Sequence, residues 1–398
     1  MRLSARAQAM SPSPTMAIDA KSKQMLAEGI DVVNFSVGEP DFDTPEHIKR
    51  AGMLAITEGH TKYTPAAGTL ELRKAICAKL RDDNGLDYKP EQIVVSNGAK
   101  QSIYNAFMVL LDPGDEVIIQ APYWVSYPEM VKLAGGVPVA VNTDESTSFK
   151  MTAEMIKAKL TPRTRAINLN SPSNPTGAVY TARELEAIAQ LAVDHDLIVV
   201  ADEMYEKLLY DGAEHISIAS FGPEIKRRTI TVNGMSKAYA MTGWRMGYCA
   251  SETVYAKAMA DLQSQTTSGP SSISQKAALE ALTGTQAPIS EMRTEFDRRR
   301  QYMMERLNRI PGFAVKVAPQ GAFYLFPNVA GTLGMTVRGR QINTADDLGQ
   351  VILEQANVGV VPGSGFGAPD YLRFSYATAM ERITEGLNRI EALLREAR

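Results

Sequence analysis

The stretch LIVVADEMYE, residues 197–206, decides the fold. It opens with a run of apolar residues and places a carboxylate, Asp202, where a buried strand would stop. Strands that are apolar without alternation are typical of parallel sheets covered on both faces. We therefore predict an α/β fold with a mostly parallel sheet between layers of helices. Four other runs are continuous in the same way: IVV at 93–95, VII at 117–119, INL at 167–169 and ITV at 230–232.

Helical patterns separate these runs, for example KQSIYNAFMVLL at 100–111 and ARELEAIAQLAVDHD at 182–196. The character changes near residue 290, where a long charged helix is followed by short strands and a C-terminal helix. We predict a large domain over residues 44–292 and a smaller α+β domain formed by residues 1–43 and 293–398. In such sheets ligands bind beyond the carboxyl ends of the strands, so the functional residues are expected there.

The composition disfavours several classes of function. The 398 residues carry a net charge of −3, which does not favour nucleic acid or an acidic membrane as the main partner. No run is apolar enough to span a bilayer, and the first residues include no apolar core of signal-peptide length, so we expect no signal segment there. The 2 cysteines are far apart, and the 4 histidines show no metal-binding spacing. We expect a cytoplasmic protein without a catalytic metal.

Small, aromatic and acidic residues follow the predicted strands. Gly98 and Ala99 precede a helix, where backbone N–H groups suit an anion, although a plain tight turn uses the same residues. Trp124 either packs in the core or lies against a planar ligand. Asp202 either forms a cap or pair within the fold, or faces a cation on a ligand. Taken singly, none of these residues decides between the two readings.

Two cations follow the apolar run TITVNG, residues 229–234. They are Lys237 and Arg245, in the stretch MSKAYAMTGWRMGY at 235–248. Most lysines reach solvent, but a buried lysine amine is a nucleophile suited to a Schiff base. Ser236 and Arg245 together suit a phosphate. Because an isolated buried charge is costly, we expect an anionic or covalently bound group to meet these cations.

Taken in order, the motifs resemble those of the fold-type-I pyridoxal-phosphate enzymes, and among them the class I aminotransferases. The resemblance covers nearly the whole chain and is closest to the bacterial branch of aspartate aminotransferases, some of which also transaminate prephenate. It implies a seven-stranded sheet in the large domain and a homodimer with shared active sites. The motifs are EPDFDTP, YTPAAG, NGAKQ, PYWVSYP, NPTG (174–177), ADEMYE (201–206), SKAYAMTGWRMGY (236–248) and YLRFSYA.

The resemblance implies pyridoxal 5'-phosphate as cofactor and a ping-pong aldimine mechanism that moves the amino group of L-aspartate to 2-oxoglutarate. Lys237 would hold the cofactor and then transfer the proton, and Asp202 would keep the ring nitrogen protonated. Tyr205 and Asn174 would hydrogen-bond the ring oxygen, and Trp124 would stack on the ring. The phosphate would be bound at Gly98, Ala99, Ser236 and Arg245, and by the partner subunit's Tyr63.

The resemblance also implies a substrate set, in which Trp124 and Asn174 take part again. Arg373, in YLRFSYA, would pair its planar fork with the α-carboxylate, next to backbone at Gly38. The loop QSQTTSGPSS, residues 263–272, lacks the arginine that grips the distal carboxylate in better-known aspartate enzymes. That task is assigned to Lys100, with Ser13 and Thr15 nearby, although Lys100 could serve the phosphate instead.

Two positions depart from the family pattern. Gly234 stands where many relatives have a hydroxyl that binds the phosphate, and Ser11 precedes Pro12 where prephenate-active relatives tend to have a lysine. Several alternatives remain open. They are a prephenate, aromatic or broad-specificity aminotransferase, a pyridoxal-phosphate lyase or decarboxylase with the same Lys237 and Asp202, and a non-catalytic pyridoxal-phosphate-binding regulator. The last is disfavoured because such regulators carry an N-terminal DNA-binding domain. We expect none here, since the chain is not basic and Ser13, an expected substrate residue, already stands near its start.

Overall fold

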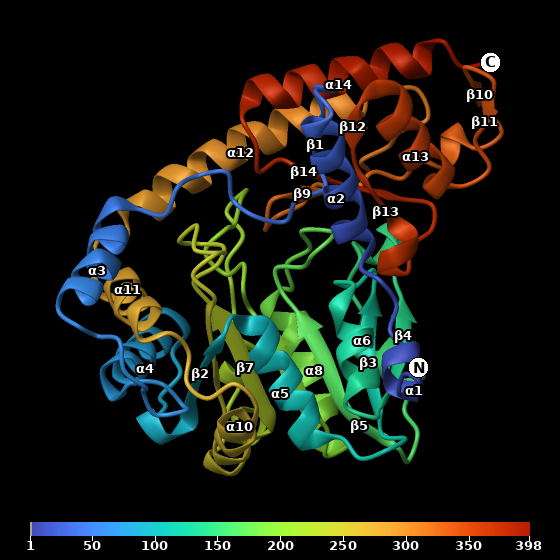
Figure 1. Cartoon of the computed structure of the whole chain (residues 1–398). Helices are drawn as coiled ribbons and strands as arrows, with labels where there is room; N and C mark the ends of the chain where they lie inside the picture. Colours follow the sequence, from blue (N-terminus) through green and yellow to red (C-terminus); the bar gives the residue numbers. More distant parts are fainter. Residues whose placement is uncertain (1) are drawn as a thin grey trace.

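The computed structural model describes residues 2–398 and is built around a seven-stranded sheet with helices on both faces (Figure 1). The strand order is β2-β8-β7-β6-β5-β3-β4. Only β8 runs antiparallel to its neighbours; the remaining pairs are parallel, so the predicted mostly parallel sheet is confirmed. The strands are β2 (Ile93–Asn97), β3 (Glu116–Ala121), β4 (Val137–Asn142), β5 (Thr164–Asn170), β6 (Ile198–Asp202), β7 (Thr229–Gly234) and β8 (Met246–Ala250).

Burial on both faces explains the continuous apolar runs. In β6, Ile198 and Val200 belong to the core cluster that includes residues of α5, whereas Val199 and Ala201 belong to the cluster that includes residues of α8. Successive side chains of a strand point to opposite faces, so both faces need apolar residues. The helices of this region are α3 (Glu46–Thr57), α4 (Leu70–Asn84), α5 (Ala99–Leu110), α6 (Ser126–Leu133), α7 (Ala153–Lys157), α8 (Ala182–Asp194), α9 (Pro223–Arg228), α10 (Thr253–Thr266) and α11 (Ser272–Thr283).

A second group of elements joins the two ends of the chain. Strand β1 (Val33–Asn34) pairs in parallel with β12 (Val358–Gly359), so the N-terminal segment packs with the C-terminal part. Strands β13 (Val361–Pro362), β14 (Leu372–Ser375) and β9 (Tyr324–Leu325) form an antiparallel sheet beside them. The other elements are α1 (Ala5–Gln8), α2 (Pro14–Ala27), α12 (Ala287–Leu307), β10 (Thr336–Val337), β11 (Arg340–Gln341), α13 (Ala345–Ala356) and α14 (Met380–Arg395).

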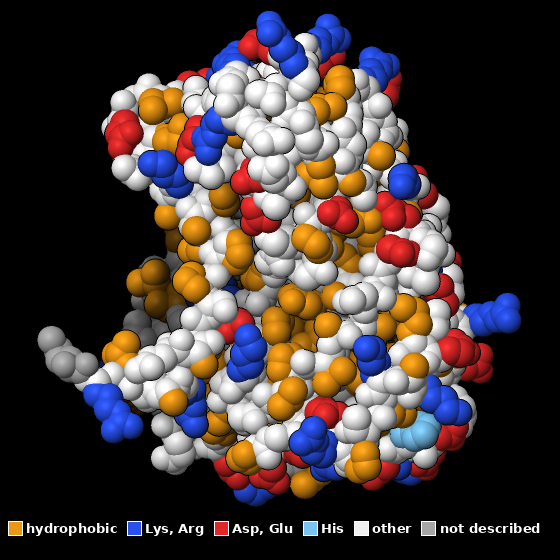
Figure 2. Space-filling view, turned by 90° about the vertical axis from the view of Figure 1, so that its right-hand side faces the viewer, with side chains coloured by type: hydrophobic (Ala, Val, Ile, Leu, Met, Phe, Trp, Pro, Cys, Tyr) orange, Lys and Arg blue, Asp and Glu red, His pale blue; other side chains and the backbone are white. Residues whose placement is uncertain are grey.

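Helix α12 connects the two groups and runs from beside α3 and α11 towards α14 (Figure 1). The predicted domain boundary at 292/293 falls inside this helix, and the division into residues 44–292 against 1–43 and 293–398 stays a prediction. The molecule is hollowed between its upper and lower parts on the face shown in Figure 2, where charges of both signs are interspersed. No helix within residues 2–398 has the length and apolar content of a membrane span.

Candidate active site

A cavity of about 460 Å³ lies where several strands of the large sheet end and the small antiparallel sheet approaches them. Its lining comes from both groups of elements, with Asp202 at the end of β6 and Arg373 in β14. Every residue assigned to the site from the sequence lines this cavity except Tyr63. They are Ser13, Thr15, Gly38, Gly98, Ala99, Lys100, Trp124, Asn174, Asp202, Tyr205, Ser236, Lys237, Arg245 and Arg373.

Lys237 is the buried amine of the cavity. It follows the end of β7, and its Nζ donates to the carbonyl oxygen of Gly38. Burial lowers the pKa of Lys237 to about 8; the charge on Glu39 opposes this shift, and that on Arg373 adds to it. A neutral amine, which can act as nucleophile or base, is therefore easier to form here than on an exposed lysine.

Asp202 is fixed by two hydrogen bonds. Its Oδ2 accepts from the Tyr127 hydroxyl at 2.7 Å, and its Oδ1 accepts from the Met204 N–H at 3.1 Å. Burial nevertheless raises the pKa of Asp202 to about 6, against the effect of both bonds. A buried carboxylate held in this way is suited to a cationic group of a ligand, because a nearby positive charge favours its ionised form.

Arg373 is a buried cation whose protein partners are neutral. Its Nη1 donates to Asn174 Oδ1 at 3.0 Å and its Nη2 to the Ser36 carbonyl at 2.6 Å. Its Nε is buried without a partner, and no ion pair links it to a carboxylate within residues 2–398. Its guanidinium lies 4.5 Å from the Tyr324 ring centroid. A planar, unpaired guanidinium in a cavity is suited to bind the carboxylate of a ligand.

The start of α5 forms a cradle for an anion. Gly98, the N-cap residue, has φ +79° and provides no side-chain cap, so the first N–H groups of the helix stay open. The Gly98 N–H itself donates to the Ser96 carbonyl at 2.8 Å, which leaves Ala99 as the first free donor. A Cβ at Gly98 would lie 2.6 Å from Arg245 Nη2, and one at Gly247 would lie 2.2 Å from the Ala99 nitrogen. The cradle therefore depends on glycine at both positions.

Arg245 and Ser236 complete this end of the cavity. Arg245 donates to the Thr242 carbonyl at 3.0 Å and to the Asn97 carbonyl at 3.3 Å, so it meets only neutral oxygens there. The departure at Gly234 has a structural reason, because a Cβ at this position would lie 2.7 Å from the Met246 carbonyl oxygen. The contact between β7 and β8 leaves no space for a hydroxyl-bearing side chain.

Lys100 also lines the cavity, in the first turn of α5 directly after Ala99. Burial lowers the pKa of Lys100, and the charge on Arg245 lowers it further. Its Nζ is 4.8 Å from the centroid of the Trp124 ring. Ser13 is the N-cap of α2, accepting from the Met16 N–H at 3.5 Å, and Thr15 stands in the first turn of the same helix. The start of α2 and the start of α5 thus place polar side chains at the same cavity.

Tyr63 is the one predicted residue that the structure does not bring to the cavity of its own chain. Its side chain is 99% exposed. Three apolar residues of the nearby helix α3, Met53, Leu54 and Ile56, are also more than half exposed. Large apolar side chains exposed within one short segment, residues 53–63, suit a surface that another molecule covers.

Two aromatic residues of the site had no role in the sequence analysis. Tyr127 lies three residues after Trp124, a helical spacing that could have indicated a shared face within PYWVSYP. Tyr324, in β9, shares a hydrogen bond of 2.8 Å between its hydroxyl and that of Tyr205. No sequence signal links Tyr324 to the site, since it comes from a two-residue strand more than a hundred residues away.

A comparison with known families matches residues 30–390 to the family described as aminotransferase class I and II. The chain belongs to this family. Among curated relatives, the aspartate aminotransferase of Geobacillus stearothermophilus is 50% identical over the full length of both chains. The aspartate/prephenate aminotransferase of Cereibacter sphaeroides is 47% identical, with 96% of each chain covered.

Solved structures agree with this assignment. The structure of the Thermus thermophilus aspartate aminotransferase with maleate superposes with a TM-score of 0.93 at 45% identity, covering 99% of this chain and 100% of the other. The fold-type-I architecture expected from the motifs is therefore confirmed. The cavity of this aminotransferase therefore lies at the carboxyl ends of the sheet strands, in a fold that it has in common with these solved structures.

Proposed function

We propose that this aminotransferase uses pyridoxal 5'-phosphate and transfers the amino group of L-aspartate to 2-oxoglutarate, giving oxaloacetate and L-glutamate. The observation that carries the proposal is the buried amine of Lys237 in a cavity that also contains Asp202 and Arg373. These three residues offer a nucleophile, an anion for a ring nitrogen and a cation for an α-carboxylate.

The donor set fits the cofactor. Its phosphate would be bound by the N–H of Ala99 at the start of α5, by Ser236 and by Arg245, where glycines keep the cradle open. Its ring would lie against Trp124, with Asp202 at the ring nitrogen and Tyr205 and Asn174 at the ring oxygen. When bound, the cofactor supplies an electron sink that makes loss of the α-proton feasible.

Side chains of the protein bind the substrate, transfer the proton and pair with the ring nitrogen. Arg373 binds the α-carboxylate and so orients the α-carbon with respect to Lys237. Lys237, whose pKa burial lowers to about 8, accepts a proton and returns it, as a general base and acid near neutral pH requires. Asp202 stays ionised when it faces a cation, because the opposite charge offsets the effect of burial on its pKa.

Aspartate is favoured as donor by a second cation at the cavity. Lys100 lies at the wall formed by α2 and α5, with Thr15 and Ser13 nearby, and would meet the distal carboxylate. The named relatives that act on aspartate support this proposal, and so does the Thermus structure, which was solved with maleate, itself a dicarboxylate. We assign Lys100 to substrate rather than to phosphate on these grounds.

A second candidate is prephenate as an additional substrate, because one relative is named for aspartate and prephenate together. In this chain Ser11 stands at the position that we associate with a lysine in prephenate-active relatives. The Ser11 N–H donates to Glu129 Oε2 at 3.1 Å, and Ser11 does not line the cavity. Aspartate therefore remains the preferred proposal.

The homodimer and the cytoplasmic location also belong to the proposal. Tyr63 and the exposed apolar side chains of α3 are on a surface that a second copy could cover. In that arrangement the partner's Tyr63 would reach the phosphate end of the cavity. The partners of the protein would then be its amino-acid and 2-oxo-acid substrates and its own second copy.

The experiment is a donor panel with purified protein loaded with the cofactor. Aspartate should bleach the cofactor absorbance and 2-oxoglutarate should restore it, with aspartate preferred over phenylalanine and alanine. Lys237→Ala should lose at least about 100-fold in kcat, the lower bound for loss of a general base. Lys276→Ala, which removes an ion pair with Glu71, is the matched control and should behave as wild type. A spectral response to another amino acid but not to aspartate would refute the substrate and leave the family assignment intact.

A further inference from the structure

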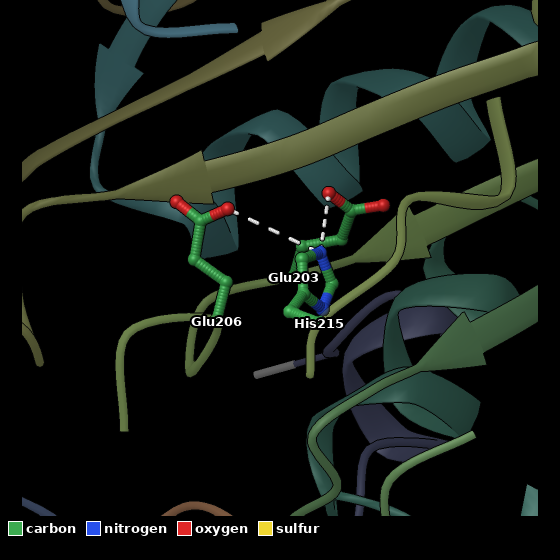
Figure 3. Close-up of side chains that lie close together, drawn as sticks. All are labelled: Glu203, Glu206 and His215. Carbon is green, nitrogen blue, oxygen red and sulfur yellow. Dashed lines mark ion pairs between the residues drawn. The ribbon is translucent and has the colours of Figure 1, made fainter. Parts of the chain in front are cut away.

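Behind the active site, a histidine is enclosed by two carboxylates (Figure 3). His215 Nε2 lies 3.1 Å from Glu203 Oε2 and 4.0 Å from Glu206 Oε2. All three side chains are at least nine-tenths buried. Neither His215 nitrogen nor Glu203 Oε2 has a hydrogen-bond partner among residues 2–398, so the imidazole meets Glu203 as an ion-pair contact. The two carboxylates are therefore the groups that determine the charge of this imidazole.

Neutral and charged neighbours fix both carboxylates. Glu203 Oε1 accepts from the Ser217 hydroxyl at 2.6 Å. Glu206 Oε2 accepts from Asn84 Nδ2 at 2.9 Å, and its Oε1 pairs with the ammonium of Lys79. Burial raises the pKa of Glu206, but the charges on Lys79 and His215 outweigh it and lower the pKa to about 2.

The charges of this cluster balance only when His215 is protonated. Two glutamates face one ammonium, which leaves one negative charge in excess inside the protein. Burial lowers the pKa of His215 and the charge on Lys79 lowers it further, yet Glu203 and Glu206 outweigh both effects and raise it above the ordinary value. Asp83 lies 3.6 Å from Lys79 but pairs more closely with Lys207, at 2.7 Å, so these two additional charges cancel. The other ionisable groups nearby are three buried tyrosines with raised pKa values, Tyr88, Tyr239 and Tyr248.

A metal ion is the competing interpretation of two glutamates and a histidine. Lys79 argues against it, because its ammonium already contacts Glu206 and would be repelled by a divalent cation. Asn84 also uses the remaining Glu206 oxygen. We therefore expect a proton on His215 rather than a bound metal ion, with the ammonium of Lys79 as the other cation of the cluster.

The position of the cluster connects it to the reaction. Glu203 follows Asp202 directly at the end of β6, and its N–H donates to the Val232 carbonyl on β7 at 2.9 Å. Asp202 lines the cavity, whereas Glu203 does not and instead meets Ser217 and His215. Burial raises the pKa of Asp202, and the charge on Glu203 raises it further.

We propose that His215 is a positioning residue for Asp202: carried as an imidazolium between Glu203 and Glu206, it neutralises the charge behind β6 and so retains the ionised form of Asp202. Loss of the imidazolium leaves the negative charge of Glu203 uncompensated one residue from Asp202. The first test below is independent of the proposed aspartate chemistry; the second rests on it.

The first test is the proton on His215, followed by NMR of the histidine Cε1–H signals in the cofactor-loaded protein. The chain has only 4 histidines, so each signal can be assigned with a single His→Gln variant. His215 should titrate above the ordinary midpoint of about 6.5, and Glu203→Gln should lower its midpoint by about one pH unit. A midpoint at or below the ordinary value would overturn the proposal. So would a shift of the His215 signal on adding one equivalent of Zn²⁺ at neutral pH, which would establish a metal site instead.

The second test is the pH dependence of kcat/KM with aspartate and of cofactor affinity by equilibrium dialysis. His215→Gln should move the acid limb of both profiles upward by about one pH unit, a tenfold loss below the limb. The double variant His215→Gln/Glu203→Gln removes the excess charge and should return both limbs towards wild type. His195→Gln, at the exposed end of α8, is the control and should leave them unchanged.

If His215 had only a structural role, the double variant would not recover relative to His215→Gln. The double variant would then be at least as impaired as His215→Gln, and the limbs of both profiles would stay in place while their maxima fall. Either result overturns the proposal. If neither the wild type nor any variant acts on aspartate, the proposed substrate is wrong. The dialysis profile and the NMR titration still decide the role of His215, so the two proposals can fail separately.

Discussion

The Tyr127 hydroxyl donates to Asp202 Oδ2 at 2.7 Å and links helix α6 to the end of strand β6. This bond fixes the direction of the carboxylate without neutralising it, since a phenol is uncharged. Burial consequently outweighs the bond, and the pKa of Asp202 is raised to about 6. The site therefore holds an oriented carboxylate whose ionisation responds to the charge of what it faces.

Asp202→Asn should alter how stability depends on pH in cofactor-free protein. The pKa of Asp202 is about 6 in the fold against 3.8 ordinarily, so between these values the folded chain holds a proton that the unfolded chain has released. Its contribution is present below pH 4 and is lost as pH rises through 6, by about 3 kcal/mol at most. Urea unfolding at pH 4 and pH 7 measures this, and the variant should lose less stability over that interval than wild type. An identical pH dependence in both proteins would contradict the raised pKa.

Arg373→Lys should raise KM for every amino donor by about 10- to 100-fold, because an ammonium cannot form two parallel bonds to a carboxylate. The increase should be the same for aspartate and alanine, since both carry the α-carboxylate. Steady-state kinetics with the two donors provide the measurement. An effect restricted to aspartate would place Arg373 at the distal carboxylate instead.

Lys100→Ala should impair dicarboxylic donors selectively, with kcat/KM for aspartate falling about 10- to 100-fold and that for alanine changing little. Lys23→Ala is the matched control, because Lys23 also lines the cavity but is paired with Asp19 at 2.7 Å. Equal losses for both donors, accompanied by weaker cofactor binding, would show that Lys100 serves the phosphate.

Tyr63→Phe should weaken cofactor binding up to about tenfold, the effect of one lost hydrogen bond. If Tyr63 acts across a dimer, a mixed dimer of Lys237→Ala and Tyr63→Phe subunits contains one intact site and should retain half of the wild-type activity. A mixed dimer of wild type with the double variant contains none and should show the Tyr63→Phe defect. Sedimentation first establishes the dimer, and a monomer at micromolar concentration would end this hypothesis.

Most of the fold could be predicted from the sequence because a strand buried on both faces needs a continuous run of apolar residues, which can be recognised locally. The run at 197–202 reads as apolar whichever helix covers it, and it became the central strand β6. The antiparallel direction of β8 has no such local pattern, since its direction depends on how the chain returns after Arg245. The same limit applies to the pairing of β1 with β12, which joins distant parts of the chain.

The same distinction between local motifs and long-range contacts applies to the site. Lys237, Asp202 and Asn174 stand in motifs that could be read in order, and the structure brings them to one cavity. Tyr324 could not be found, because its contact with Tyr205 depends on how β9 approaches the large sheet. Likewise, the bond from the Gly98 N–H to Ser96, which leaves Ala99 as the free donor, is a detail of turn geometry that residue types do not encode.

The unpaired guanidinium of Arg373 has a consequence for how long a newly made chain survives. Its Nε is buried and has no partner in the described part of the chain, and the amine of Lys237 is buried as well, so both groups lower the stability of the empty protein. Ligands that pair with these charges stabilise the folded state, so cofactor and substrate should slow unfolding and proteolysis. Abundance in the cell would then follow cofactor supply, with chains that remain unloaded degraded first.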